Sequence, residues 1–174
     1  QMVLTTARLS SQKGHRYLLE AIPRVIAAHP EAVFVLVGAG PERTAIEASI
    51  AEAGLHSHVR LLGERSDIEE LSCAADLFVF PTTFEGSPFA LLEAMAYGLP
   101  VVTTDASGIA EVVRDGIDGI VVEKENPEAL ANGIRRSLAD RSAMSQMATS
   151  AQERVRQFSA DHMASQTLHL LGSL

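Results

Sequence analysis

The sequence of 174 residues has one cysteine and no tryptophan, and aromatic residues make up only 5% of it. The single thiol, Cys73, cannot form an intramolecular disulfide, so a disulfide framework is excluded and a reducing compartment is expected. No apolar run approaches the roughly 18 residues of a membrane-spanning helix, and no signal peptide is recognisable. The expected localisation is cytoplasmic, and peripheral attachment of the full-length protein to a membrane stays open.

Positive charge is also scarce, because 14 Lys and Arg residues stand against 22 Asp and Glu, which gives a net charge of −8. An acidic chain has no general attraction for nucleic acid or for an anionic membrane surface, so nucleic acid is not an expected partner. A phosphate-bearing ligand would need a local cluster of basic residues. The histidines and acidic residues show no metal-ligand spacing, so the sequence predicts no metal site.

Apolar, strand-like runs alternate with helix-period segments over most of the chain. The runs are continuous, which is typical of a parallel sheet covered on both faces, and they span residues 2–6, 33–37, 59–62, 77–80, 101–104 and 120–122. Helices are predicted over residues 17–26 with a kink at Pro23, and over 42–53, 68–74, 89–97, 127–139, 141–158 and 161–171. The predicted fold class is a doubly wound α/β domain with a six-stranded parallel, Rossmann-like sheet and C-terminal helices.

The loop after the fourth predicted strand contains the first part of a candidate site. In an open sheet of order 3-2-1-4-5-6, ligands bind beyond the carboxyl ends of the strands, between the first and the fourth. Here Ser87 can cap the following helix and Pro88 suits its first turn. The N–H groups of Phe89, Ala90 and Leu91 would then point into the crevice and bind a phosphate group. An ordinary capped helix without a ligand is the alternative interpretation.

Charged residues near the same loops extend this candidate site. Glu85 in the loop and Glu93 on the helix can contact opposite ends of one molecule, and carboxylates accept hydrogen bonds from sugar hydroxyls. Arg8 and Lys13 follow the first strand and could neutralise a diphosphate. Gly40 lies in a Gly-x-Gly turn that allows close approach beside a ligand, although the full nucleotide-cofactor fingerprint is absent. For each charged residue alone, a solvated surface position is the alternative.

The run from Glu85 to Val102 resembles a known pattern, the Glu-x7-Glu signature of retaining glycosyltransferases with the GT-B fold. These form the large group-1 family, which includes glycogen synthase and related mannosyltransferases. Further segments match that family in order and spacing: Ala7–Leu9, Lys13–Gly14, Val37–Pro41, Leu62–Gly63, Ala75–Pro81, Glu111–Val113 and Asp115–Gly119. The resemblance covers nearly the whole chain.

This resemblance implies roles for the candidate residues. Arg8 and Lys13 would hold the diphosphate of a nucleotide-sugar donor, together with the backbone N–H groups of residues 89–91. Glu93 would bind the ribose hydroxyls, and Glu85, as the catalytic residue, would lie near the reacting carbon of the transferred sugar. The resemblance also implies that the reaction needs no metal ion and no cofactor besides the donor.

The resemblance also bears on domain organisation. Family members have two domains that face each other across a cleft, and the N-terminal one binds the acceptor and carries a catalytically important histidine. Residues 1–174 resemble only the C-terminal, donor-binding domain, in which the loop around Arg65 would meet the nucleobase. The N-terminal domain would then be a partner of this chain, which alone would be inactive.

Other functions remain open at this point. They include a non-catalytic nucleotide-sugar binding module and a sugar-nucleotide epimerase of similar fold. A glycoside hydrolase also uses paired carboxylates, but it has no use for the cations Arg8 and Lys13. The sequence leaves the nucleobase, the sugar, the acceptor and the anomer of the product undetermined.

Overall fold

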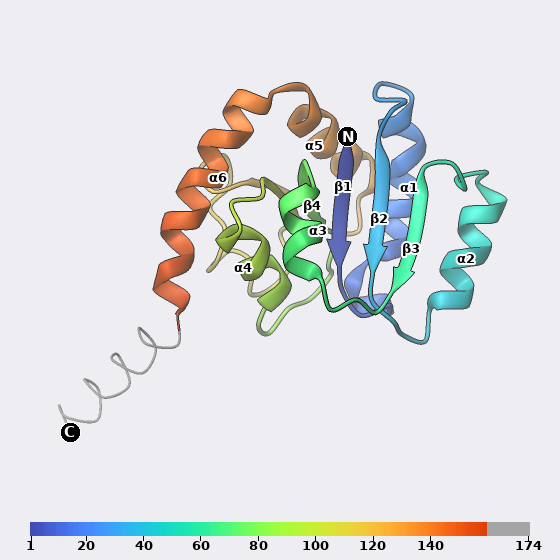
Figure 1. The fold of residues 1–174 in the computed structure, drawn as a ribbon, viewed down its shortest axis with the longest axis horizontal. Helices are drawn as coiled ribbons and strands as arrows, with labels where there is room; N and C mark the ends of the chain where they lie inside the picture. Colours follow the sequence, from blue (N-terminus) through green and yellow to red (C-terminus); the bar gives the residue numbers. More distant parts are fainter. Residues whose placement is uncertain (160–174) are drawn as a thin grey trace.

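The computed structural model describes residues 1–159 and is built around a six-stranded parallel sheet of order β3-β2-β1-β4-β5-β6 (Figure 1). Every pair of neighbouring strands is parallel. The strands are β1 Met2–Thr6, β2 Val33–Val37, β3 Val59–Gly63, β4 Leu77–Phe80, β5 Val101–Thr104 and β6 Ile120–Val122. The predicted fold class is therefore confirmed, and the strand order is the one on which the location of the candidate site was based.

Helices follow most of the strands, close to their predicted bounds. They are α1 His15–Ile26, α2 Arg43–Glu52, α3 Ile68–Ala74, α4 Phe89–Ala96, α5 Pro127–Ala139 and α6 Arg141–Val155. α1 begins two residues earlier than predicted, and the helix continues through Pro23. The chain after α6 changes to a 3-10 turn, η2 Arg156–Phe158, where one continuous helix was predicted. The helix predicted over residues 161–171 lies outside the described residues.

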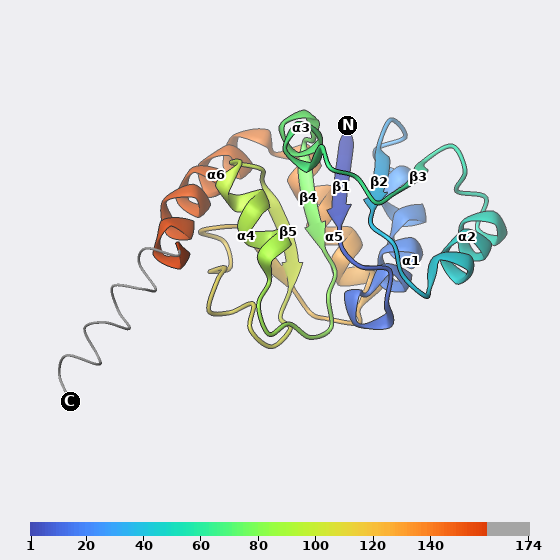
Figure 2. The ribbon, with the colours of Figure 1, turned by 60° about the horizontal axis from the view of Figure 1, so that its bottom comes forward.

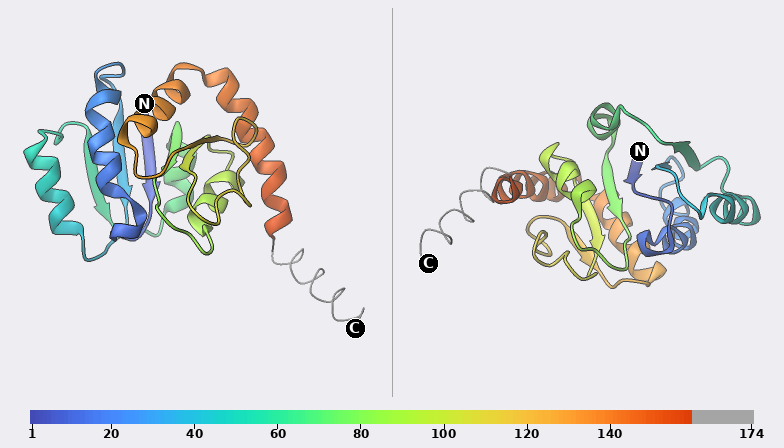
Figure 3. Two further views of the ribbon diagram at one scale, coloured as in Figure 1. Left: turned by 180° about the vertical axis from the view of Figure 1, so that it is seen from behind. Right: turned by 90° about the horizontal axis from the view of Figure 1, so that it is seen from below.

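Helices cover both faces of the sheet, as the continuous apolar strands predict. Figure 1 shows α3 and α4 in front of the sheet, and the view from behind in Figure 3 shows α1 and α5 on the other face. One apolar cluster joins α1, α2 and α5 to the sheet, with Ile22 and Phe34 fully buried in it. A second cluster joins α4 to the sheet and includes Met95 and Phe78. None of the helices between residues 1 and 159 is long and apolar enough to cross a membrane.

The loops that leave the carboxyl ends of β1 and β4 lie against each other, along the edge that Figure 2 brings forward. A short 3-10 turn, η1 Ser11–Lys13, follows β1. The backbone N–H of Thr83 donates to the carbonyl of Gln12 at 2.8 Å. Gly14 has a φ of +66°, and a Cβ there would lie 1.9 Å from the carbonyl oxygen of Pro81. Glycine at this position therefore allows α1 to begin directly against the loop after β4.

Candidate functional site

A buried carboxylate and a lysine meet where these two loops touch. Glu85 is 4% exposed, and Lys13 donates from Nζ to its Oε1 at 2.5 Å. The hydroxyl of Thr82 donates to the same oxygen at 2.9 Å. The structure thus brings together two predicted site residues that are 72 positions apart. The sequence interpretation assigned them to separate parts of a ligand and missed their contact with each other.

The loop that carries Glu85 is held by backbone and hydroxyl contacts. The hydroxyl of Thr104 on β5 donates to the carbonyl of Thr82 at 2.5 Å. The backbone N–H of Glu85 donates to the carbonyl of Ser107 at 3.1 Å. Gly108 has a φ of +84°, and a Cβ there would lie 2.5 Å from the carbonyl oxygen of Glu85. Contacts from the loops after β1 and β4 and from the segment after β5 therefore hold this carboxylate in place.

A hollow of about 440 Å³ lies at the same edge of the sheet, at the carboxyl ends of β1 and β2. It brings together three of the predicted residues, Arg65, Ala90 and Glu93. Glu93 is exposed, and the described part of the chain offers its carboxylate no hydrogen bond or ion pair. The apolar residues that flank it in sequence, Leu92 and Ala94, therefore do not enclose its carboxylate. Its side chain instead lines a solvent-accessible hollow, where it is available to a ligand.

Arg65 forms a two-pronged contact with Asp67 at the edge of the same hollow. Nε donates to Oδ1 at 2.8 Å, and Nη2 donates to Oδ2 at 2.5 Å. The hydrogen bond from Arg65, which outweighs desolvation, lowers the pKa of Asp67, and the pKa of Arg65 is raised by the same contact. The guanidinium is therefore already paired, which leaves the backbone of this loop as the part that a nucleobase would meet.

The N-terminus of α4 differs from the prediction. Pro88, with φ −83° and ψ 62°, is the N-cap, and the side chain of Ser87 makes no capping hydrogen bond. The prediction that Ser87 caps the helix is wrong, because Pro88, whose ψ is not helical, occupies the N-cap position, while the helix itself begins at Phe89 as predicted. The N–H of Phe89 donates to Ser87 O at 2.9 Å and that of Leu91 to Pro88 O at 3.0 Å. Among residues 1–159, the N–H of Ala90 has no protein acceptor, so one of the three predicted donors remains available.

Arg8 and Gly40 lie on neighbouring loops at this edge of the sheet. Arg8 is exposed, and its guanidinium forms no ion pair within the described residues. A Cβ at Gly40 would lie 2.2 Å from the carbonyl oxygen of Leu9. The close approach that Gly40 permits is therefore made to the loop after β1, which carries Arg8.

His15 is a buried residue that the sequence interpretation missed. Its side chain, at the start of α1, is 1% exposed, and neither ring nitrogen has a hydrogen-bond partner in the part of the chain that is described. Burial, together with the charge of Lys13, lowers its pKa from 6.5 to about 4. His15 is therefore a neutral, buried imidazole next to Gly14, and its place at the first position of α1 gave no clear signal of burial in the sequence.

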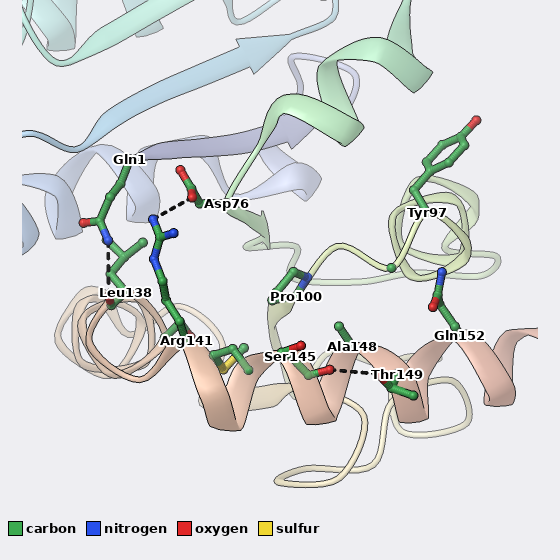
Figure 4. Close-up of a pocket in the computed structure, with 13 residues that line it drawn as sticks. Gln1, Asp76, Tyr97, Pro100, Leu138, Arg141, Ser145, Ala148, Thr149 and Gln152 are labelled. Carbon is green, nitrogen blue, oxygen red and sulfur yellow. Dashed lines mark hydrogen bonds and ion pairs between the residues drawn. The ribbon is translucent and has the colours of Figure 1, made fainter.

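Another hollow, of about 400 Å³, lies at the opposite end of the sheet between α6 and the segments that precede β4 and β5 (Figure 4). Arg141 donates to Asp76 across its rim at 2.8 Å. None of the predicted site residues lines it. Within residues 1–159, no group of three or more His, Cys, Asp or Glu side chains could hold a metal ion.

Comparison with known proteins decides the family. Residues 1–140 match the family model for glycosyl transferases group 1. The chain belongs to the group 1 glycosyltransferases. Its residues 85 and 93, which carry the predicted Glu-x7-Glu signature, lie within the matched part.

Relatives of this glycosyltransferase domain are longer than the chain. It is 32% identical over 173 residues to the uncharacterised glycosyltransferase MJ1607 of Methanocaldococcus jannaschii, covering 98% of this chain and 44% of that protein. It is 31% identical over 173 residues to the lipopolysaccharide core biosynthesis glycosyltransferase LpsE of Rhizobium meliloti, covering 99% and 50%. The chain therefore spans about half the length of these curated relatives.

Solved structures of the family share the fold of this glycosyltransferase domain. The crystal structure of Anabaena Alr3699/HepE in complex with UDP and glucose is 30% identical, with a TM-score of 0.91 over 99% of this chain and 48% of that one. The C-terminal domain of the group 1 glycosyltransferase LpcC from Francisella tularensis has the same fold. It is 22% identical, with a TM-score of 0.78 over 90% of this chain and 85% of that one.

Proposed function

We propose that this chain is the donor-binding domain of a retaining glycosyltransferase, which transfers a sugar from a nucleotide-diphosphate sugar to an acceptor. The observation that carries the proposal is that the carboxyl edge of the sheet holds both the Glu85–Lys13 pair and the hollow lined by Glu93 and Ala90. The complex of Anabaena Alr3699/HepE with UDP and glucose, a close structural neighbour, supports a donor of this class.

In this proposal the nucleoside lies in the hollow at Glu93. The free carboxylate of Glu93 accepts hydrogen bonds from both ribose hydroxyls, and the loop at Arg65 meets the base through its backbone. The diphosphate lies over the N-terminus of α4, where the N–H of Ala90 and the helix dipole favour an anion. Each contact uses a group that the described residues leave available.

Lys13 connects the diphosphate with the sugar. Its ammonium has three N–H donors and spends one on Glu85, so the others can reach a phosphate oxygen without breaking that contact. Glu85 then lies near the reacting carbon, where the transition state of glycosyl transfer carries positive charge. A fixed carboxylate stabilises that charge without reorganising, while Lys13 and Arg8 stabilise the leaving diphosphate. The proposal therefore includes donor binding without a divalent metal.

The full-length protein, in this proposal, adds an N-terminal domain that binds the acceptor. Titration of the present chain with UDP in the presence of EDTA tests the donor half. We expect binding, and we expect Glu93→Ala to weaken it by about 1.5–3 kcal/mol, the usual contribution of hydrogen bonds to a charged group. Glu52→Ala, at an exposed carboxylate at the end of α2, is the matched control and should bind UDP like the wild type.

An unchanged affinity of a folded Glu93→Ala variant would remove the ribose assignment. Binding of UDP only after magnesium is added would refute metal independence. GDP and ADP, titrated in parallel, identify the base. Turnover of a nucleotide sugar by the full-length protein distinguishes a transferase from a non-catalytic binding module, and the product distinguishes it from an epimerase.

A further inference from the structure

A further hollow of about 530 Å³ opens by the start of α1 and shares no lining residue with the hollow of Glu93. It is lined by the residues that directly precede the two members of the pair, Gln12 and Phe84, and by the first turns of α1. The residues that matter for its chemistry are Gln12, Arg16, Tyr17, Glu42, Phe84 and Glu125. Its volume is within the range of about 300–1,000 Å³ in which small-molecule pockets fall.

The wall formed by Phe84 is held in place. Nε2 of Gln12 donates to the carbonyl of Phe84 at 2.8 Å, and the N–H of Thr83 donates to the carbonyl of Gln12 at 2.8 Å. The ring of Phe84 is nevertheless 55% exposed. A large apolar ring on a fixed loop beside a hollow offers a flat surface for stacking, which costs little conformational entropy on binding.

The polar groups of the hollow are available to a ligand. Across residues 1–159, the carboxylates of Glu42 and Glu125 form no hydrogen bond or ion pair. The guanidinium of Arg16 stacks on the ring of Tyr17, 4.3 Å from its centroid, and the hydroxyl of Tyr17 is its one hydrogen-bond partner in this same part of the chain. With two unpaired carboxylates against one cation, the hollow disfavours a phosphate group. It suits a neutral ligand rich in hydroxyls, since carboxylates accept hydrogen bonds and the guanidinium donates them.

We propose that this hollow binds a neutral sugar unit of the acceptor, with the apolar face of the sugar stacked on Phe84 and its hydroxyls bonded to Glu42, Glu125 and Arg16. This inference depends on the proposed function, because Phe84 directly precedes Glu85, which that function places beside the reacting carbon. The acceptor would then contact the donor-binding domain directly, in addition to its own domain.

Nuclear magnetic resonance titrations of the chain with separate probes test the proposal. We expect methyl α-glucoside, methyl α-mannoside or methyl α-galactoside to shift the amide signals of Phe84, Glu125 and Gln12. UDP should shift those of Ala90 and Glu93 and should not displace the glycoside. Methyl α-glucuronide, which adds one negative charge to the same ring as the glucoside, should bind more weakly. If UDP does not bind to the chain, the proposed function is contradicted. If UDP binds but the glycosides do not, only the proposal for this hollow is contradicted.

Variants sharpen the test. Glu125→Gln and Phe84→Ala should each weaken glycoside binding about threefold to tenfold, the range for one hydrogen bond or stacking contact, and leave UDP binding unchanged. Phe84→Tyr, which keeps the ring, should retain binding. Ile117→Ala, at a half-exposed apolar residue outside the hollow, is the matched control.

Three results would overturn the proposal. The first is that no neutral glycoside shifts the signals of the hollow. The second is that Phe84→Ala and Glu125→Gln bind glycosides like the wild type. The third is competition of the glycoside with a UDP-sugar but not with UDP, which would assign the hollow to the transferred sugar of the donor.

Discussion

The contact of Lys13 with Glu85 predicts an energetic coupling that denaturation can measure. Lys13→Met keeps most of the side chain, whose ammonium lies 5.4 Å from the centroid of the Phe80 ring, but removes the charge. Removing one partner of a buried ion pair lowers the free energy of unfolding by about 3–5 kcal/mol, because the other charge is left buried and unpaired. Lys13 is 20% exposed, and Thr82 still donates to Glu85, so we expect a smaller loss of about 2–3 kcal/mol.

The second single variant is Glu85→Gln. The amide oxygen of the new side chain can still accept a hydrogen bond from Thr82, and the ammonium of Lys13 can be solvated by water. The free energy of unfolding should therefore fall by only about 1 kcal/mol. In the double variant no charge is left unpaired, so its loss should fall short of the sum of the single losses by about 1–2 kcal/mol, a typical coupling between residues in contact. Urea denaturation of the wild type and the three variants gives all four free energies of unfolding.

A matched control is present on the surface of α2. Arg43 donates from Nε to Glu47 at 2.8 Å, but both side chains are nearly half exposed, at 46% and 48%. The same cycle with Arg43→Met and Glu47→Gln should give a coupling of only about 0.3–0.5 kcal/mol. If the coupling of Lys13 with Glu85 were as small as this, the carboxylate would not be held by the lysine, and the fixed geometry on which the proposed mechanism rests would be refuted.

Three further predictions concern stability. The pKa of His15 is lowered from 6.5 to about 4, so the unfolded state binds the extra proton first, and stability should fall by roughly 3 kcal/mol as the pH decreases through that interval. His15→Leu should lack this loss, and an unchanged pH profile of denaturation would contradict the assignment. Asp118 is fully buried and accepts hydrogen bonds from the guanidinium of Arg114 and the hydroxyl of Ser150. Burial opposes its ionisation, but these hydrogen bonds outweigh burial and lower the pKa of Asp118 from 3.8 to about 2. Its contribution, roughly 2 kcal/mol, should therefore be present above pH 4 and lost toward pH 2, and Asp118→Asn should remove this part of the acid transition. Gly14→Ala should lower the melting temperature far more than Gly54→Ala, because both have a φ of +66° but only the first would meet a backbone oxygen. Equal shifts would show that the contact with Pro81 relaxes freely.

The fold could be predicted from the sequence because its signals are local and agree with one another. Continuous apolar strands such as Val33–Val37 require cover on both faces, and short connections with right-handed crossovers leave few strand orders. The starts of α3, α4, α5 and α6 were also predicted correctly, but helix capping was not, because it depends on backbone angles. At α4, which begins at Phe89 as predicted, Pro88 has a non-helical ψ and occupies the N-cap position that was predicted for Ser87.

Helical geometry explains why Glu93 is exposed although its neighbours in sequence are apolar. Its sequence neighbours Leu92 and Ala94 are apolar, which suggests a buried setting. On α4, however, Leu91, Ala94 and Met95 form the buried face, and residue 93 points about 200° away from residue 91, because successive residues turn by about 100°. The apolar neighbours in sequence are therefore not neighbours of this carboxylate in space.

The contact between Lys13 and Glu85 had no local signal, since it depends on how two loops 72 residues apart in sequence fold against each other. Only the strand order indicates that they meet, because it places β1 beside β4. The resulting difference between the two glutamates supports their proposed roles. The carboxylate of Glu85 is buried and held by a lysine and a hydroxyl, which suits stabilisation of a charge that develops at one fixed atom. Glu93 is exposed and unpaired among the described residues, which suits reversible binding of ribose hydroxyls as the donor enters and leaves.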